Sequence, residues 1–355
     1  MKKIYTLLFV IALAWTSCHA QRFTDALDRG VVAVQVDTGN FVSWRRLGEE
    51  YYDVTYKLFR NGTFVANVNT THYYDKEGNS SSLYSVSAVV RGTEQAQSPK
   101  VMPWKRHDYS SAYATINGYL DITLEKVYDR QGNNVTSHYS PNDAEMADLD
   151  GDGKLEIIIK RLNTYDAQNL YPTSNDKEFV VIEAYKVDWS NGNATRMWWI
   201  DCGPNMVSLN STEIDVIAYD WDMDGCAEVV LRGADDMVIH HKNGTRLIGT
   251  NDNYRNDIDR TGGADHAWTR TGPEYLIYMD GTTGEPFQVM DYPIPRESAD
   301  AWGYGLGHPT NDSYGHRSSK YFFGAPYLDG RKPSLFLARG IYASSLPEAS
   351  MGAIA

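Results

Sequence analysis

The feature that most constrains this chain is a short acidic run that leads at once into an apolar one. Residues 148–160 read D-L-D-G-D-G-K-L-E-I-I-I-K, so Asp148, Asp150 and Asp152 alternate and Glu156 closes the acidic part. Carboxylates this close repel one another unless a cation lies between them. Oxygen ligands at this spacing suit calcium, which takes six to eight of them in a flexible shell. The sequence therefore predicts that these four acids are calcium ligands.

The run begins like the loop of an EF-hand but does not continue as one. The twelfth position of such a loop is a bidentate glutamate, and here that position is Ile159. Residues 157–159 are all isoleucine, and a β-branched run of this kind is typical of a buried strand. We expect a calcium-bound turn that leads into a β-strand, not a helix–loop–helix.

The same pattern occurs again further along the chain. Asp220, Asp222, Asp224 and Glu228 align with the first four acids and are predicted as a second set of metal ligands. A weaker third copy at 327–339 keeps Asp-Gly, the apolar run and a closing cation but lacks the other acids. Repeated units that cannot bury their apolar faces alone predict a propeller or a solenoid. The aspartates themselves are most simply interpreted as structural ligands that fix loops and touch no substrate.

Composition points to an all-β chain. Aromatic residues make up 12% of the 355 residues and there are 29 glycines, which favours many short strands joined by turns. No window of a dozen residues carries an uninterrupted helical stripe of apolar side chains. The net charge of −13 excludes a fold built to bind nucleic-acid phosphates. An anionic substrate would need a local basic patch or bound cations.

The first residues predict export from a bacterial cell. Residues 1–20 contain two lysines, an apolar run of about a dozen residues and a small-residue cleavage zone, as a secretory signal does. The apolar run is too short to span a membrane, and no transmembrane segment is predicted. Either signal peptidase cuts after Ala20, or Cys18 is lipidated. The product is then periplasmic, extracellular or, with a lipid on Cys18, at the outer-membrane surface. The other thiols, Cys202 and Cys226, form either a disulfide or two separate buried groups.

The rest of the chain divides into three parts. Residues 22–102 predict a fibronectin-III-like β-sandwich, with short strands and an Asn61-Gly62 hairpin turn. Residues 108–342 predict part of a propeller, whose strands begin at Leu120–Leu124 and include a pair at 179–187 and 196–200. Residues 343–355 form an off-pattern tail.

Two loop-like stretches predict a carbohydrate groove. Residues 251–270 and 301–317 mix Trp and Tyr with Asn, Asp, His and Arg. Aromatic faces can stack on sugar rings, and amides can bind hydroxyl groups. The alternative is that both stretches are ordinary surface loops.

Several segments, taken in order, resemble one family. They read A-L-D-R-G-V-V-A-V at 26–34, F-V-S-W-R at 41–45, N-D-A and A-D-L-D-G-D-G-K-L-E within 142–156, N-Y-R-N at 253–256, G-P-E-Y-L at 272–276, and D-S-Y-G-H-R and Y-L-D-G-R-K-P-S-L-F-L-A-R-G-I-Y within 312–342. Over about residues 24–342 the chain is similar to the rhamnogalacturonan lyases of polysaccharide lyase family eleven. The resemblance implies a fibronectin-III-like domain, then an eight-bladed, calcium-stabilised β-propeller.

The resemblance also implies a substrate and a reaction. The substrate is rhamnogalacturonan I, the pectin backbone, and the reaction is β-elimination at galacturonate C4, with calcium as the cofactor. A base removes the C5 proton and the rhamnosyl oxygen leaves from C4. A cation or an arginine at the carboxylate stabilises the intermediate. Calcium would also join an anionic sugar to an acidic protein.

The resemblance implies only some of the site residues. Asn142 corresponds to a substrate-contacting asparagine, and His316 and Arg317 are further expected substrate contacts. A family substrate aspartate would fall on Leu162, so Asp166 is the nearest acid that could replace it. The catalytic Arg and Lys are expected C-terminal to residue 355, because only about half a propeller is present. We therefore expect a monomeric lyase or the N-terminal half of one. The alternatives are a non-catalytic secreted carbohydrate-binding propeller and, more distantly, a calcium-dependent adhesion propeller.

Overall fold

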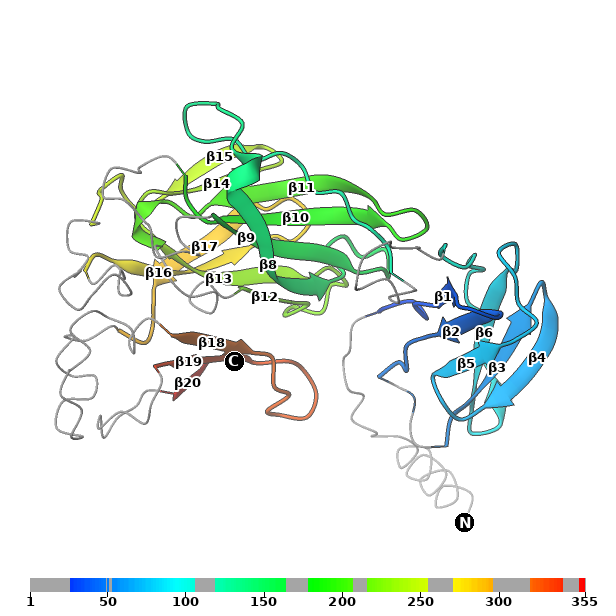
Figure 1. Cartoon of the computed structure of the whole chain (residues 1–355). Coiled ribbons are helices and arrows are strands. Elements are labelled where there is room, and N and C mark those ends of the chain that lie inside the picture. The colour runs from blue at the N-terminus through cyan, green and yellow to red at the C-terminus, as the bar shows by residue number, and fades with distance from the viewer. Residues whose placement is uncertain are drawn as a thin grey trace, which may run out of the picture.

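The computed structural model describes residues 26–48, 50, 53–105, 119–163, 178–206, 216–254, 271–295, 320–340 and 351–354. Within these ranges the chain forms β-strands and two short 3-10 turns, with no α-helix, so the all-β prediction is confirmed (Figure 1). In the same ranges, no helix has the length and apolarity that crossing a bilayer requires.

The described strands form five separate sheets, none of them closed on itself. Two small sheets, of order β1-β2-β5 and β4-β3-β6-β7, come from the first part of the chain. Three sheets follow in the longer second part of the chain and are called the large sheets here, of order β15-β14-β11-β10-β9-β8, β12-β13-β16-β17 and β18-β19-β20. The strands are β1 Val32–Gln35, β2 Asn40–Ser43, β3 Thr55–Arg60, β4 Thr63–Val68, β5 His72–Asp75, β6 Tyr84–Val90, β7 Thr93–Glu94, β8 Tyr139–Ala147, β9 Glu156–Asn163, β10 Val181–Asp188, β11 Asn193–Asp201, β12 Val216–Tyr219, β13 Glu228–Ala234, β14 Met237–His241, β15 Gly244–Ile248, β16 Glu274–Met279, β17 Pro286–Asp291, β18 Tyr321–Gly324, β19 Leu335–Arg339 and β20 Met351–Ile354.

The two small sheets face each other and share one apolar core. Alternate residues of β3 point inward, and Tyr56 and Leu58 are almost completely buried. Trp44 packs edge-on against Tyr56, with ring centroids 5.6 Å apart. The predicted hairpin between β3 and β4 is confirmed, because Asn61 and Gly62 have φ of +54° and +81°. This part lies at one end of the molecule (Figure 1).

The larger part repeats one unit three times. In each, an edge strand leads through a turn into an antiparallel neighbour: β8 into β9, β12 into β13, and β18 into β19. The edge strands also contact each other in order, β8 with β12 and β12 with β18. The predicted turn-and-strand repeat is therefore confirmed, and it places the three acidic or formerly acidic turns on neighbouring sheets.

One hairpin connects two of these sheets. Strands β14 and β15 lie between β13 and β16 in the chain, yet β14 pairs with β11 of the first large sheet. A shared core results, because Ile239 of β14 packs in the same buried cluster as Ile200 of β11 and Leu231 of β13. The first two large sheets are thus held to each other by chain connectivity as well as by packing.

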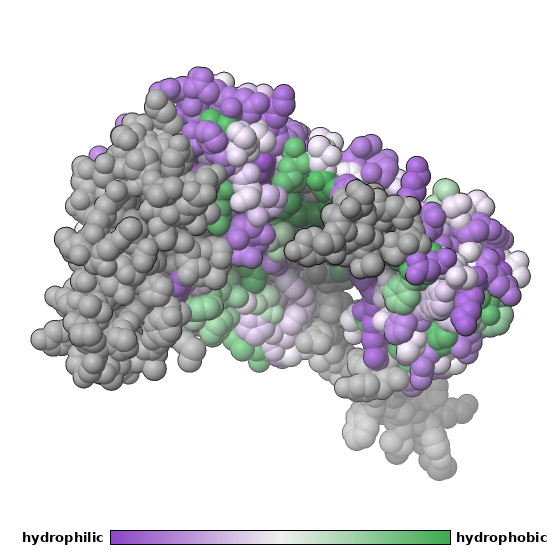
Figure 2. Space-filling model, viewed as in Figure 1, coloured by the Kyte–Doolittle hydropathy of each residue, from purple (hydrophilic) through white to green (hydrophobic). Residues whose placement is uncertain are grey.

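Apolar side chains reach the surface on some edge strands. Met146 of β8 is 45% exposed and Phe322 of β18 is 47% exposed. Leu328, in the turn between β18 and β19, is 61% exposed. The space-filling view shows apolar residues of the larger part at the surface, between polar regions (Figure 2). Exposed apolar groups on unpaired strands are the kind of surface that further strands cover in other sheet proteins.

Two expectations about local structure were wrong or incomplete. Leu120–Leu124 was expected to form a strand, but no strand lies there. Ile122 and Leu124 instead pack against the buried Tyr185 on the face of the first large sheet, and the Glu125 amide donates to the Tyr185 hydroxyl at 3.0 Å. Apolar and polar residues do alternate at 120–124, but this segment packs on the face of a sheet and does not pair as one of its strands. Cys202 and Cys226 are both free thiols, so the disulfide alternative does not hold.

We predict that His240→Phe makes the protein more resistant to mild acid. His240 of β14 stacks on Trp199 of β11, with centroids 3.7 Å apart and an interplanar angle of 4°. Burial, followed by Arg196 and Arg130, lowers the pKa of His240 to about 4. In the unfolded chain a histidine titrates near pH 6.5. Stability should therefore be intact above that pH and fall as the pH drops towards 4, by about 1–2 kcal/mol at this partly exposed ring.

Thermal unfolding at pH 7 and pH 4.5 measures this effect. Phenylalanine keeps the ring stack without the titration, so the advantage of the variant should grow by several degrees at the lower pH. His240→Gln removes both the titrating group and the ring stack. Its Tm should depend as weakly on pH as that of His240→Phe, but should be lower at both pH values. An equal difference between wild type and His240→Phe at both pH values would contradict the prediction.

Candidate functional site

The second acidic turn, between β12 and β13, collects four carboxylates. Asp220, Asp222, Asp224 and Glu228 each present an oxygen within 4.8 Å of the others. Asp220 is buried and accepts hydrogen bonds from the backbone N–H groups of Asp224, at 3.0 Å, and Gly225, at 2.9 Å. Glu228 accepts from the Trp221 N–H at 2.9 Å. The turn itself orients the acids, and the predicted second ligand set does come together.

The charges of this turn are not balanced by the described residues. Burial, and then the neighbouring acids Asp222, Asp220 and Asp224, raise the pKa of Glu228 to about 7. No ion pair joins any of the four acids to a basic side chain in the described parts of the chain. Four hard oxygen donors with unbalanced charge are the donor set that calcium prefers. The second turn therefore fits a calcium ion.

The first acidic turn, between β8 and β9, has the same sequence pattern. Asp148, Asp150 and Asp152 present oxygens within 4.8 Å of one another. The buried Asp148 accepts hydrogen bonds from the backbone N–H groups of Gly151, Asp152 and Gly153, at 2.8, 3.1 and 2.7 Å. Glu156 lies beside this group rather than in it, and it accepts from the Leu149 N–H at 2.8 Å. The structure thus brings three of the four predicted ligands together.

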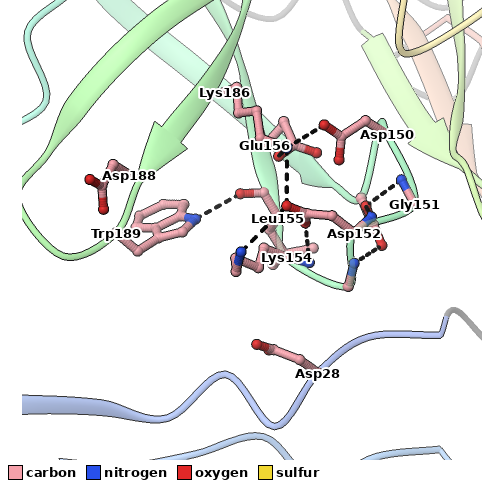
Figure 3. A network of polar contacts seen from close by, with 12 residues as sticks. Asp28, Asp150, Gly151, Asp152, Lys154, Leu155, Glu156, Lys186, Asp188 and Trp189 are labelled. Carbon is pink, nitrogen blue, oxygen red and sulfur yellow. Dashed lines mark hydrogen bonds and ion pairs between the residues drawn. The ribbon is translucent and has the colours of Figure 1, made fainter. Parts of the chain in front are cut away.

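A lysine that the sequence analysis did not single out lies in this first turn. The ammonium of Lys186, on β10, contacts Asp150 Oδ2, lies 3.0 Å from Asp152 Oδ2 and 4.0 Å from Glu156 Oε1 (Figure 3). Burial lowers the pKa of Lys186, but the hydrogen bonds to Asp150 and Asp152 outweigh that effect, and the pKa is raised overall. The one sequence signal was a lysine near the end of β10, a strand that also carries Glu183 and Asp188.

The first turn also contacts its neighbours on two sides. The Ala227 amide, in the second turn, donates to the Asp148 carbonyl at 2.8 Å. On the other side the Asp28 amide donates to the Gly153 carbonyl at 2.8 Å. Gly153 has φ of +83°, and a Cβ there would lie 3.3 Å from the Asp28 nitrogen. The first turn therefore lies where the small sheets meet the large ones.

The third turn, between β18 and β19, has lost the acidic cluster. Tyr327 stands where the other turns have their first aspartate, and its hydroxyl lies 2.8 Å from that of Tyr219. Asp329 accepts from the backbone N–H groups of Arg331, at 2.8 Å, and Lys332, at 3.0 Å. In the described residues, carboxylate groups able to hold a metal occur at the first two turns only.

The predicted substrate residues are only partly described. Asn142 is exposed on β8, where the register with β9 shifts between Pro141 and Ala144. Its neighbour Asp143 forms an ion pair with the buried Lys160 at 3.4 Å. Asp166, His316 and Arg317 lie outside the described residues. Leu162, which takes the place of the family aspartate, belongs to the apolar core.

The closing cations of the second and third repeats share one acid. Arg339 pairs with Glu274 at 2.7 Å, and Arg232 lies 3.3 Å from the same carboxylate. The Tyr321 hydroxyl also donates to Glu274. The side chains of the two arginines, Glu274 and Tyr321 are all nearly buried. These arginines therefore hold the second and third large sheets together, and their charge is used internally.

We predict that Glu274→Gln strongly destabilises the fold. The amide keeps the shape of the side chain but removes the negative charge that two buried guanidinium groups contact, which costs about 3–5 kcal/mol. The shift in the chemical denaturation midpoint measures the loss. Glu94→Gln is the matched control, because Glu94 pairs with Lys57 at side-chain exposures of 40% and 35%. Such a surface pair contributes far less than a buried one, because solvent screens it. Similar losses in the two variants would contradict the assignment.

Two family models match the chain. The model described as "Rhamnogalacturonan lyase family 11, C-terminal domain" matches residues 119–350. The model described as "Rhamnogalacturonan I lyases beta-sheet domain" matches residues 22–104. Together they cover both groups of sheets, and the first alone covers more than half of the chain.

Curated proteins and solved structures agree with these matches. The rhamnogalacturonan endolyase YesW of Bacillus subtilis (strain 168) is 36% identical over 355 aligned positions, which cover 96% of this chain and 50% of YesW. The rhamnogalacturonan exolyase YesX of the same organism is 33% identical, covering 91% and 47%. A crystal structure of YesW superposes with a TM-score of 0.67, and that of the Bacillus licheniformis rhamnogalacturonan lyase PL11 with 0.66 at 34% identity, each covering 91% of this chain and 50% of that one. The chain spans about half the length of these relatives.

Proposed function

Because the chain belongs to rhamnogalacturonan lyase family 11, we propose that it acts on the rhamnogalacturonan I backbone of pectin, as a lyase or as a part of one. The observation that carries the proposal is the match of both family models in the family's order along the chain. The relatives named for this activity differ in endo and exo action, so the proposal does not extend to the mode of cleavage.

The finer architecture is part of the proposal. The two small sheets form a fibronectin-III-like sandwich, and the three large sheets are successive blades of an eight-bladed propeller. The ordered contacts among the edge strands β8, β12 and β18 support a radial arrangement of blades. The exposed Met146 and Phe322 on two of these strands support further packing partners beyond the described sheets. The protein is proposed to be exported and monomeric.

Calcium is the proposed cofactor. Asp220, Asp222, Asp224 and Glu228 would hold one ion, since their oxygens converge and their charges are unbalanced. A bound ion supplies positive charge that fixes the turn and lowers the repulsion among its acids. The turn is formed by residues between an edge strand and a buried strand. The ion would therefore act on the position of β12 and its neighbours.

The proposed chemistry is β-elimination at galacturonate C4. A base removes the C5 proton, the C4 oxygen leaves with the rhamnosyl group, and a C4–C5 double bond remains in the product. Among the described residues Asn142 is the one we assign to the substrate. Its exposed amide, at the register shift in β8, can both donate to and accept from sugar hydroxyl groups. Lys160 holds the adjacent Asp143 and so fixes the backbone that carries Asn142. Asp166, His316 and Arg317 remain proposed substrate contacts, and we assign no catalytic residue to this chain.

We predict that this chain binds rhamnogalacturonan I, and that a lyase containing it gives a calcium-dependent rise in near-ultraviolet absorbance when mixed with the polysaccharide. The new double bond is conjugated with the uronate carboxylate, so it absorbs where the substrate does not. Asn142→Ala should lower kcat/KM about tenfold, because one or two substrate hydrogen bonds are lost. Asn67→Ala is the matched control, because Asn67 is an exposed asparagine on β4 of the small sheets, and it should leave the rate unchanged.

The other outcomes separate the alternatives. Binding of the polysaccharide without a rise in absorbance would support the second candidate, a secreted carbohydrate-binding propeller. Absence of both binding and a rise would contradict the proposal for this chain. A rise that persists after a chelator removes divalent cations would contradict the calcium part only.

A further inference from the structure

The first two acidic turns share a sequence pattern but differ in one through-space neighbour. Strand β9 pairs with β10, and Ile157 lies opposite Tyr185, so the next residue of β10, Lys186, lies beside Glu156. In the second turn Val229 lies opposite Met279 of β16, and the next residue is Asp280. The same structural position therefore carries a cation at the first turn and an acid at the second.

The Lys186 ammonium occupies the position expected of a bound cation. It contacts Asp150 and Asp152 together and lies 4.0 Å from Glu156, the three acids that surround the turn on its side facing β10 (Figure 3). Its fit is incomplete, since Asp150 Oδ1 is buried and has no hydrogen-bond partner. The side chain of Lys186 is also 44% exposed, so it has room to leave. The ammonium is thus a stand-in that a stronger cation can displace.

We propose that Lys186 is a built-in counter-cation that competes with calcium for the first acidic turn. The turn keeps its shape without calcium and binds calcium about tenfold more weakly than it would without the lysine, which corresponds to about 1.4 kcal/mol. The second turn has Asp280 at that position and depends on added calcium. This inference rests on the calcium part of the proposed function and not on lyase activity.

The position of the first turn gives this difference a structural consequence. Asp28 binds the turn through the Gly153 carbonyl, at 2.8 Å. The Trp189 indole donates to the Leu155 carbonyl at 3.0 Å, and the Trp104 indole donates to the Trp189 carbonyl at 2.7 Å. The contact between the small and the large sheets is therefore built on the turn that carries its own cation. That contact should persist when calcium is removed.

Calcium titration by calorimetry on the chelator-treated full chain tests the proposal. Asp222→Asn and Glu228→Gln first remove two of the proposed ligand charges of the second turn. A fall of one in the number of bound calcium ions then verifies the calcium site there. Lys186→Met in the same background should then bind one calcium at least about tenfold more tightly than the Lys186 protein. Adding Asp150→Asn should abolish the gain, which assigns it to the first turn.

Stability gives a second, independent readout. Without calcium, Lys186→Met should lower the Tm, because Asp150 and Glu156 lose the nearby ammonium and Asp152 keeps only Lys154, at 3.4 Å. Saturating calcium should restore the Tm. A purely structural lysine would give the loss of Tm without any gain in calcium affinity, and that result would overturn the proposal. If silencing the second turn removes no calcium, the calcium assignment there fails separately, while the Lys186→Met comparison still tests this inference at the first turn.

The reciprocal substitution extends the test to the other turn. Asp280→Lys, with the second turn intact, should weaken calcium binding there by about tenfold. Asp280 also accepts hydrogen bonds from the amide and hydroxyl of Thr283, both at 2.7 Å, so Asp280→Asn is the control for the loss of these contacts. Equal calcium affinity in the Lys and Asn variants would contradict the view that the charge at this position sets the affinity.

Discussion

Repulsion among closely spaced carboxylates is the constraint on which this structure depends. In each of the first two turns the backbone folds so that its own N–H groups point at the leading aspartate, Asp148 or Asp220. These hydrogen bonds position the acids but cannot neutralise them, since backbone amides carry only partial charge. Each turn therefore needs a full positive charge nearby. The chain meets this need differently at the two turns, although their sequences align residue for residue.

Because the unit is repeated, the same local constraint determines how neighbouring sheets are joined. Every unit begins with an edge strand that is only partly buried and continues into a strand that is mostly buried, so the turn lies between two elements that pack differently. Neighbouring turns then join directly, as the Ala227 amide does with the Asp148 carbonyl. Where the acids are lost, other contacts take over: Tyr327 binds Tyr219, and Arg339 and Arg232 share Glu274. Either kind of contact holds neighbouring sheets in fixed positions relative to each other.

The sequence predicted the local features well and the through-space ones poorly. The Asn61-Gly62 hairpin, the β10–β11 pair and the turn before β9 follow from short-range patterns that side-chain chemistry imposes. Strand β8 was not anticipated because Pro141 and the Asn-Asp pair after it disfavour strands, and an edge position with a register shift tolerates them. No pattern of residues at a fixed spacing predicts the pairing of β14 with β11 or the position of Lys186. Both depend on which strands the fold makes neighbours.

The overall charge connects these points to function. A chain of net charge −13 that is proposed to act on a uronate polymer needs positive charge where protein and substrate meet. In the described residues four buried or partly buried arginines pair with internal acids: Arg161 and Arg196 with Glu183, and Arg232 and Arg339 with Glu274. These side chains stabilise sheets, and they have little charge left for a sugar carboxylate. We propose that bound calcium supplies further positive charge. On that proposal, a fold with Lys186 at the first turn and Asp280 at the corresponding place of the second can remain assembled while its calcium content changes.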